Sequence, residues 1–273
     1  MAVRKWAVAP LAALFVFSVV EKWAHAAAVD LTGSLDLLHT ASDGSQLPYR
    51  LYVPDNPDSG NGNPLILFLH GWGEKGTDNE SQLRPVGGLI EAARRNDSFL
   101  LAPQVPAGGN WMADTISVVG EILQNTQDSY AVDSSRIYVT GYSMGGFGTL
   151  NSMLIFPEVF AAAVPMHSSI SPAAGRYIDH IPTWGFNGEL DTSAERMSEL
   201  LQAMASAGLA DMRYTELAGI GHSGWDDIYR DINQELYPWL FSNEIVATPL
   251  PAAAPLLLSA LLGLVALRRW RRR

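Results

Sequence analysis

The sequence of 273 residues contains no cysteine. This absence excludes disulfide bridges, zinc–thiolate sites, iron–sulfur clusters and a cysteine nucleophile. Charged residues are few, at 17% of the chain, and hydrophobic residues make up 48%, a balance that excludes a disordered or low-complexity protein. Basic residues number 18 against 28 acidic ones, and the net charge of −10 argues against nucleic acid as a partner.

Motifs for metal ions and nucleotides are also missing. The sequence contains neither an H-E-x-x-H motif nor an EF-hand loop, and the glycines of residues 141–148 do not have the spacing of a dinucleotide fingerprint. Asp226, Asp227 and Asp231 fit the solvated start of a helix better than a metal site. We therefore expect no metal site and no cofactor.

Residues 1–26 have the pattern of a secretory signal peptide. Arg4 and Lys5 precede an uncharged stretch at 6–20, and small residues at the end of the segment mark a cleavage site for signal peptidase. The alternative is an uncleaved N-terminal anchor. The uncharged stretch is short for a membrane-spanning helix, which needs about 20 apolar residues, so we expect cleavage and export.

The C-terminal segment, residues 247–273, contains a second uncharged stretch at 249–267, which is followed by five arginines. This stretch can cross a bilayer with the arginines on the cytoplasmic side, and it predicts membrane contact. Residues 248–252 read Thr-Pro-Leu-Pro-Ala. They resemble a PEP-CTERM-type sorting tail of the variant with a Val-Pro-Leu-Pro-Ala box, although Thr248 stands in place of valine. The resemblance implies export and processing by an exosortase-type enzyme; a plain C-terminal anchor is the alternative.

The part between the two ends is strongly acidic. Residues 1–26 carry a net charge of +2 and residues 247–273 carry +5, so residues 27–246 carry −17. This charge suits an exported domain in solution and disfavours polyanionic substrates. We find no internal repeat and no linker in this part, and we expect a single domain.

Strand-like and helical stretches alternate through this domain. Two short runs at 34–40 and 47–53 flank a Ser-Asp-Gly turn and predict an N-terminal antiparallel hairpin. Further strand-like runs lie at 65–69, 99–102, 136–140, 160–166, 183–186 and 213–217, and helical stretches lie at 114–130, 144–156, 193–206 and 227–241. The alternation predicts an α/β fold with a mostly parallel central sheet and helices on both faces.

The pattern of a nucleophile elbow follows the run at 136–140. Residues 141–145 read Gly-Tyr-Ser-Met-Gly, a G-x-S-x-G motif between a strand and a helix, which is the context that this motif requires. The glycines permit a tight turn that exposes the hydroxyl of Ser143 at the carboxyl end of the strand. The alternative is a glycine-rich turn whose serine only caps the helix.

A serine nucleophile needs a base within hydrogen-bonding reach. In the chain order Ser, Asp or Glu, His, the base follows the serine, and His167, His180 and His222 do so. His222 lies in a glycine-rich loop between the last strand and the last helix, so it is our candidate for the base. His167, at the end of a strand-like run, is the second candidate. We expect His180 to lie on the surface.

The acid should lie between the serine and the base, at the end of a strand. Asp191 follows the strand-like run at 183–186 and is our candidate to fix the tautomer of His222. Glu189 is the competing carboxylate, and we expect it to be a loop residue.

Other residues are expected around the reacting carbonyl group. The backbone amides of Trp72 and Met144 are our candidates for an oxyanion hole, because one follows an earlier strand and the other follows the nucleophile. His70 is expected to stabilise the loop that carries Trp72. Trp111 and Trp225 are candidates for the wall of a substrate pocket, with ordinary core packing as the alternative.

Together these motifs resemble the α/β-hydrolase superfamily, and within it a branch described as predicted peptidases, phospholipase/carboxylesterase-like or feruloyl-esterase-like proteins. The resemblance extends over about residues 47–243. It rests on the segments 47–54, 67–76, 102–104, 137–146 and 221–225. Asn187 departs from the pattern, because many members have histidine there. The resemblance implies an α/β-hydrolase fold with Ser143, Asp191 and His222 as a catalytic triad.

The sequence therefore predicts a secreted serine hydrolase that cleaves carboxylic esters, either short acyl esters or esters linked to polysaccharide. One alternative is a serine peptidase of the prolyl-oligopeptidase-like kind, although residues 27–246 leave no room for a gating propeller. Another is a non-catalytic binding module, which the presence of all three triad members disfavours. Residues 168–180 are a candidate for a short lid.

Overall fold

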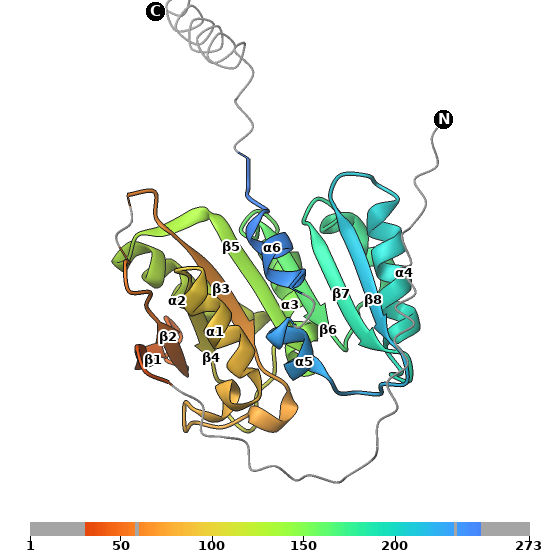
Figure 1. Ribbon diagram of the computed structural model, residues 1–273. Helices are drawn as coiled ribbons and strands as arrows, with labels where there is room; N and C mark the ends of the chain where they lie inside the picture. Colours follow the sequence, from red (N-terminus) through yellow and green to blue (C-terminus); the bar gives the residue numbers. More distant parts are fainter. Residues whose placement is uncertain (1–30, 58–59, 232–233, 247–273) are drawn as a thin grey trace, which may run out of the picture.

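The computed structural model describes residues 31–57, 60–231 and 234–246 (Figure 1). Within these residues eight strands form one sheet in the order β1-β2-β4-β3-β5-β6-β7-β8. Strand β2 pairs antiparallel with β1 and with β4, and all other neighbours are parallel. The strands are β1 (Ser34–Thr40), β2 (Gln46–Tyr52), β3 (Asn63–Leu69), β4 (Phe99–Pro103), β5 (Val132–Tyr142), β6 (Ala162–Met166), β7 (Thr183–Gly188) and β8 (Met212–Leu217). The predicted α/β fold with an N-terminal antiparallel hairpin is confirmed.

Helices cover both faces of the sheet (Figure 1). The α-helices are α1 (Gly87–Arg95), α2 (Ala113–Ser129), α3 (Met144–Ile155), α4 (Ala194–Ala205), α5 (Trp225–Arg230) and α6 (Leu236–Phe241). Short 3-10 helices are η1 (Trp72–Glu74), η2 (Ser81–Val86) and η3 (Pro172–Tyr177). Helices α2, α3 and α4 contribute to one apolar core, and α1, α5 and α6 contribute to a second.

Strand β3 shows how the sequence produces two cores. Leu65, Leu67 and Leu69 belong to the first core, whereas Ile66 and Phe68 belong to the second. Successive side chains of a strand point to opposite faces of the sheet, so a continuous apolar run serves both layers. This explains why the run has no polar alternation.

The C-terminal helical stretch differs from the prediction. The stretch predicted as one helix at 227–241 is divided into α5 and α6. Asp231, with a φ of 48°, lies at the division, and its Oδ1 accepts hydrogen bonds from the amides of Glu235 and Leu236 at 3.0 Å each. One residue therefore ends the first helix and accepts hydrogen bonds from amides at the start of the second.

The turn after β5 is tightly packed against the end of β3. A Cβ atom at Gly141 or Gly145 would collide with the carbonyl oxygen of Leu69. Ser143 between them has a φ of 56°, in the left-handed region that non-glycine residues rarely adopt. The turn thereby holds the serine at the carboxyl edge of the parallel strands.

The predicted signal peptide at 1–26 and the predicted sorting tail at 247–273 lie outside the described residues. Among the residues that the structure describes, no helix combines the length and the apolar character that crossing a membrane requires. The described residues all lie within the predicted domain at 27–246.

Candidate active site

Three side chains from three different loops form a line of hydrogen bonds at the carboxyl edge of the sheet. Ser143 lies between β5 and α3, Asp191 follows β7, and His222 follows β8. The hydroxyl of Ser143 lies 2.7 Å from Nε2 of His222, and Nδ1 of His222 lies 2.6 Å from Oδ2 of Asp191. Because a carboxylate only accepts, His222 carries its proton on Nδ1 and accepts from the serine hydroxyl through Nε2. This is the arrangement needed to activate a serine nucleophile.

Asp191 is almost enclosed and fully hydrogen-bonded. Its side chain is 2% exposed, whereas that of His222 is 51% exposed. Its Oδ1 accepts hydrogen bonds from the amide and the hydroxyl of Ser193, at 2.9 and 2.8 Å. Burial by itself would raise the pKa of the Asp191 carboxyl, but these two donors and the neighbouring imidazoles outweigh burial and hold the pKa well below its usual range. The group is therefore an anion at neutral pH.

The competing carboxylate lies elsewhere. Glu189 is exposed, and its Oε2 accepts a hydrogen bond from the amide of Gly219 at 2.7 Å. The structure thus places Asp191 against His222, whereas Glu189 links the loop after β7 to the loop after β8.

His70 stabilises the loop that follows β3. Its Nδ1 lies 2.6 Å from the carbonyl oxygen of Gly71, and its Nε2 accepts a hydrogen bond from the amide of Val105 at 2.9 Å. Burial lowers the pKa of His70 to about 4, so the imidazole is neutral near neutral pH. A neutral imidazole is what this pair of bonds requires, since one nitrogen donates and the other accepts.

The structure places Trp72 and Met144, the predicted oxyanion-hole residues, each at the start of a helix. Trp72 is the first residue of η1, directly after the loop from β3, and Met144 is the first residue of α3. Amides at the first turn of a helix have no partner within that helix, so they are free to bind an anionic oxygen. The side chain of Trp72 is exposed, and Nζ of Lys75 lies 2.9 Å from the centre of its ring.

The two tryptophans predicted to line the pocket lie in different environments. Trp111 is completely buried, and its Nε1 donates a hydrogen bond to the carbonyl oxygen of His70 at 2.9 Å. It therefore supports the loop after β3 from inside the core, so the alternative of core packing holds and its prediction as a pocket wall is corrected. Trp225 is half-buried and stacks on Tyr142, with ring centres 4.4 Å apart. Its ring also meets that of His222 edge to face at 6.0 Å, so it borders the site.

The candidate lid packs against a helix. Within residues 168–180, Gly175 of η3 faces the side chains of Met204 and Leu200 in α4. Ile178 is completely buried at the end of this segment. These contacts tie the segment to the body of the domain.

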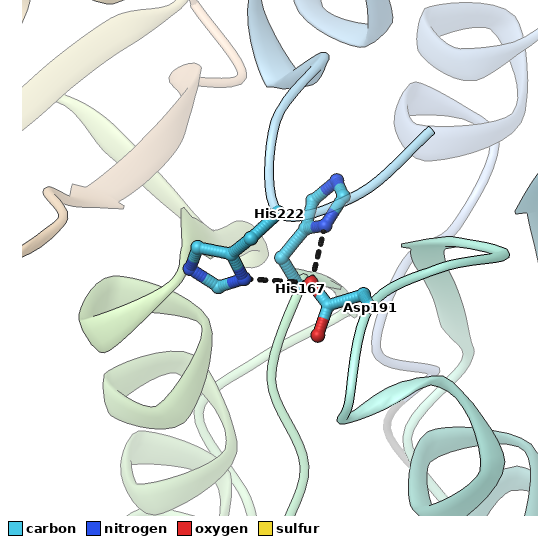
Figure 2. Close-up of side chains that lie close together, drawn as sticks. All are labelled: His167, Asp191 and His222. Atoms are coloured by element: carbon cyan, nitrogen blue, oxygen red, sulfur yellow. Dashed lines mark hydrogen bonds and ion pairs between the residues drawn. The ribbon is translucent and has the colours of Figure 1, made fainter. Parts of the chain in front are cut away.

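A second histidine contacts the carboxylate of Asp191, as Figure 2 shows. Nδ1 of His167 lies 2.9 Å from Oδ2 of Asp191, the same oxygen that His222 contacts. The sequence indicates His167 only as the second candidate for the base; its position at the end of the strand next to the serine strand is the signal for a place near the site. His167, Asp191 and His222 each offer a ligand atom within 4.8 Å of the others, a spacing that a metal ion could use. In the structure, both Nδ1 atoms are instead engaged with the carboxylate.

Parts of the chain are similar in sequence to known proteins. The family described as the prolyl oligopeptidase family matches residues 94–227. The chain is 29% identical over 117 residues to poly(3-hydroxyalkanoate) depolymerase C of Paucimonas lemoignei, covering 38% of this chain and 27% of that protein. It is 29% identical over 102 residues to a probable feruloyl esterase C of Aspergillus niger, covering 36% and 37%. The chain thus spans well under half of the length of these relatives.

Solved structures of esterases are similar to this chain in fold. A thermostable esterase has a TM-score of 0.72 and 32% identity, over 80% of this chain and 64% of that chain. The feruloyl esterase module from Clostridium thermocellum has a TM-score of 0.64 at 15% identity, over 80% and 90%, which is a likeness of fold. With the sheet order and the serine turn described above, these similarities show that the chain has the α/β-hydrolase fold.

Proposed function

We propose that this protein is a serine hydrolase that cleaves carboxylic esters, with Ser143 as nucleophile, His222 as base and Asp191 as the orienting acid. The observation that carries the proposal is the unbroken line of hydrogen bonds from the Ser143 hydroxyl through His222 to Asp191. The side chain of His222 is half exposed, as access by a substrate requires, while Asp191 is enclosed.

The reaction follows from this geometry. Oγ of Ser143 attacks the ester carbonyl carbon as its proton moves to Nε2 of His222, and the negative charge of Asp191 stabilises the imidazolium. The amides of Trp72 and Met144 bind the oxyanion of the tetrahedral intermediate. When the intermediate collapses, the C–O bond to the alcohol breaks, and His222 gives its proton to the departing oxygen. Water then attacks the acyl-enzyme by the same route, which releases the acid and restores Ser143.

The names of the relatives favour esters over peptides as the substrates of this protein. Their names include a feruloyl esterase and an acetylxylan esterase of Aspergillus awamori, the latter 26% identical over 202 residues. We infer an ester of a short acyl group or one attached to polysaccharide, with Trp72 and Trp225 beside it. A serine peptidase is the second candidate, because the family match is to the prolyl oligopeptidase family.

We also propose that the protein is exported. Residues 1–26 would direct export, and residues 247–273 would contact the membrane until an exosortase-type enzyme processes them. The relevant partners would then be that processing enzyme and an extracellular or cell-envelope ester.

A substrate panel tests the proposed reaction. The purified protein and its Ser143→Ala variant would be assayed on p-nitrophenyl acetate, butyrate and octanoate, on feruloyl and acetyl-sugar esters, and on peptide amides. We expect ester turnover that disappears in the variant. Amide cleavage without ester cleavage would favour the peptidase. A folded protein that turns over nothing and whose Ser143 resists a fluorophosphonate would overturn both enzymatic proposals.

A further inference from the structure

His167 has a backbone conformation that is energetically unfavourable for a residue with a side chain. It follows the last residue of β6, with a φ of 51°, and its amide donates a hydrogen bond to the carbonyl oxygen of Phe186 in β7 at 2.8 Å. A left-handed conformation at a residue with a side chain costs free energy, and such residues concentrate at functional sites. Ser143, which follows the neighbouring strand β5, also has a positive φ, of 56°.

The side chain of His167 completes the set of donors around Asp191. Nδ1 of His167 and Nδ1 of His222 lie 2.9 and 2.6 Å from the same oxygen, Oδ2, while Oδ1 accepts two hydrogen bonds from Ser193. A carboxylate has about four lone-pair sites for acceptance, so these four donors saturate it. Its orientation is thus determined by contacts from β6, the β7 loop and the β8 loop together.

The contact determines the tautomer of His167. The carboxylate only accepts, so Nδ1 carries the proton and Nε2 has a lone pair. That Nε2 is buried, and within the described part of the chain it has no hydrogen-bond partner. The side chain is 0% exposed. Burial lowers the pKa of His167, so the ring is a neutral donor that adds no charge to the site.

His167 is poorly placed to be the base. The hydroxyl of Ser143 is already bound by Nε2 of His222, and His167 has no access to solvent. Its ring instead meets the rings of His222 and Trp225 edge to face, at 5.5 and 5.7 Å. The titratable groups that act on it are Asp191 and His222, and the charge of Asp191 also acts on Tyr214 of β8.

We propose that His167 is a positioning residue for the hydrolysis proposed above: it fixes the Asp191 carboxylate and shares Oδ2 with His222. The sharing has a chemical consequence. An oxygen that accepts from two imidazoles attracts each proton less strongly than an oxygen that accepts from one. Removing His167 should therefore strengthen the attraction between Oδ2 and the Nδ1 proton of His222.

Two substitutions separate positioning from packing. His167→Ala removes the donor, whereas His167→Asn keeps an N–H close to the position of Nδ1 and tolerates the left-handed backbone. For p-nitrophenyl butyrate we expect His167→Ala to lower kcat/KM about tenfold through misplacement of the acid and base. We also expect the acid limb of its kcat/KM profile to move up by about 0.5 pH unit. His167→Asn should restore the wild-type limb.

An acid limb that stays in place in His167→Ala, with a loss of melting temperature alone, would overturn the proposal. A proton NMR experiment on the wild-type protein tests it even if the alanine variant fails to fold. We expect two downfield imidazole N–H resonances, of which one persists in His222→Ala. A single resonance that disappears in that variant would contradict the shared oxygen. If the protein hydrolyses no ester, the proposed function fails, while the NMR result still tests the contact of His167 with Asp191.

Discussion

Asp191 is the residue at which the hydrogen bonds of the site meet. Both of its oxygens accept two hydrogen bonds, and its side chain is almost completely buried. Such a carboxylate contributes by charge as well as by shape, because the imidazolium of His222 forms beside it during the reaction.

Asp191→Asn tests this contribution. The side chain of asparagine has nearly the same shape but no charge, and its amide can force the wrong tautomer on His222. We expect kcat to fall by about 10³- to 10⁴-fold with little change in circular dichroism. Glu189→Gln is the matched control, since its amide oxygen can still accept from Gly219, and it should keep wild-type kcat. Equal losses in the two variants would contradict the assignment of Asp191.

His70 gives the protein a pH-dependent stability. Its pKa is about 4 in the folded protein and about 6.5 when unfolded, so below about pH 6.5 the unfolded chain binds more protons. The contribution of His70 is complete above that pH and is lost as the pH falls toward 4, by about 1.4 kcal/mol per pH unit. Urea unfolding at about pH 7 and pH 5 measures the loss. His70→Gln should reduce it; an unchanged loss in the variant would exclude His70 as its source.

The loop after β3 depends on one buried asparagine. Asn79 has a φ of 52°, its amide donates to Oε1 of Gln104 at 2.7 Å, and its Nδ2 donates to Oδ1 of Asp36 at 2.7 Å and to the carbonyl oxygen of Tyr49 at 2.9 Å. These bonds join the loop to β1, β2 and the end of β4. The segment that contains Trp72 is therefore attached to the sheet by side chains as well as by the chain itself.

Asn79→Ala should remove this attachment. The change removes the donor to the carbonyl oxygen of Tyr49 and the acceptor of the buried Gln82 amide, and it places alanine in a left-handed conformation, so we expect a loss of about 2–4 kcal/mol in the free energy of unfolding. Chemical denaturation measures it. Asn61→Ala, at an exposed position on a turn, is the control and should change stability by less than about 0.5 kcal/mol. Similar effects of both substitutions would contradict this role for Asn79.

The elements that the sequence predicts best are those with a local signal. The apolar run at 65–69 identifies a central strand, and the glycines around Ser143 identify the turn. The division at Asp231 could not be predicted, because the apolar pattern continues through α5 and α6 while the break depends on a φ of 48°. Helix α1 had no counterpart among the predicted helices.

The same limit applies to the site. Ser143 could be singled out because its motif is contiguous in the sequence. The contact of His167 with Asp191 depends on how β6 and β7 lie side by side, which residue spacing does not encode. Trp111 was assigned to the pocket because a tryptophan in a loop near the site can point either outward or into the core, and packing alone decides which.

At the scale of the whole molecule, the candidate residues lie at one edge of the sheet. Ser143, Asp191 and His222 follow β5, β7 and β8, which run parallel and end on the same side. Two apolar cores hold those strands, so the loops can differ without disturbing the sheet.

The proposed export makes a prediction for the whole chain. If residues 1–26 are a signal peptide, mass spectrometry of the exported protein should find Ala27 at its N-terminus, because small residues precede that bond. A variant in which Ala24 and Ala26 are both replaced by bulky residues should accumulate unprocessed. An exported wild-type protein that still begins at Met1 would favour the uncleaved anchor.

The ammonium group of Lys75 determines which face of the exposed Trp72 ring is accessible. It lies over one face of the Trp72 ring, and it also donates a hydrogen bond to the carbonyl oxygen of Gly109 at 3.0 Å. A cation on one face of an indole leaves only the other face for stacking. A sugar or aromatic ring of the proposed substrate can therefore stack on Trp72 from one side only.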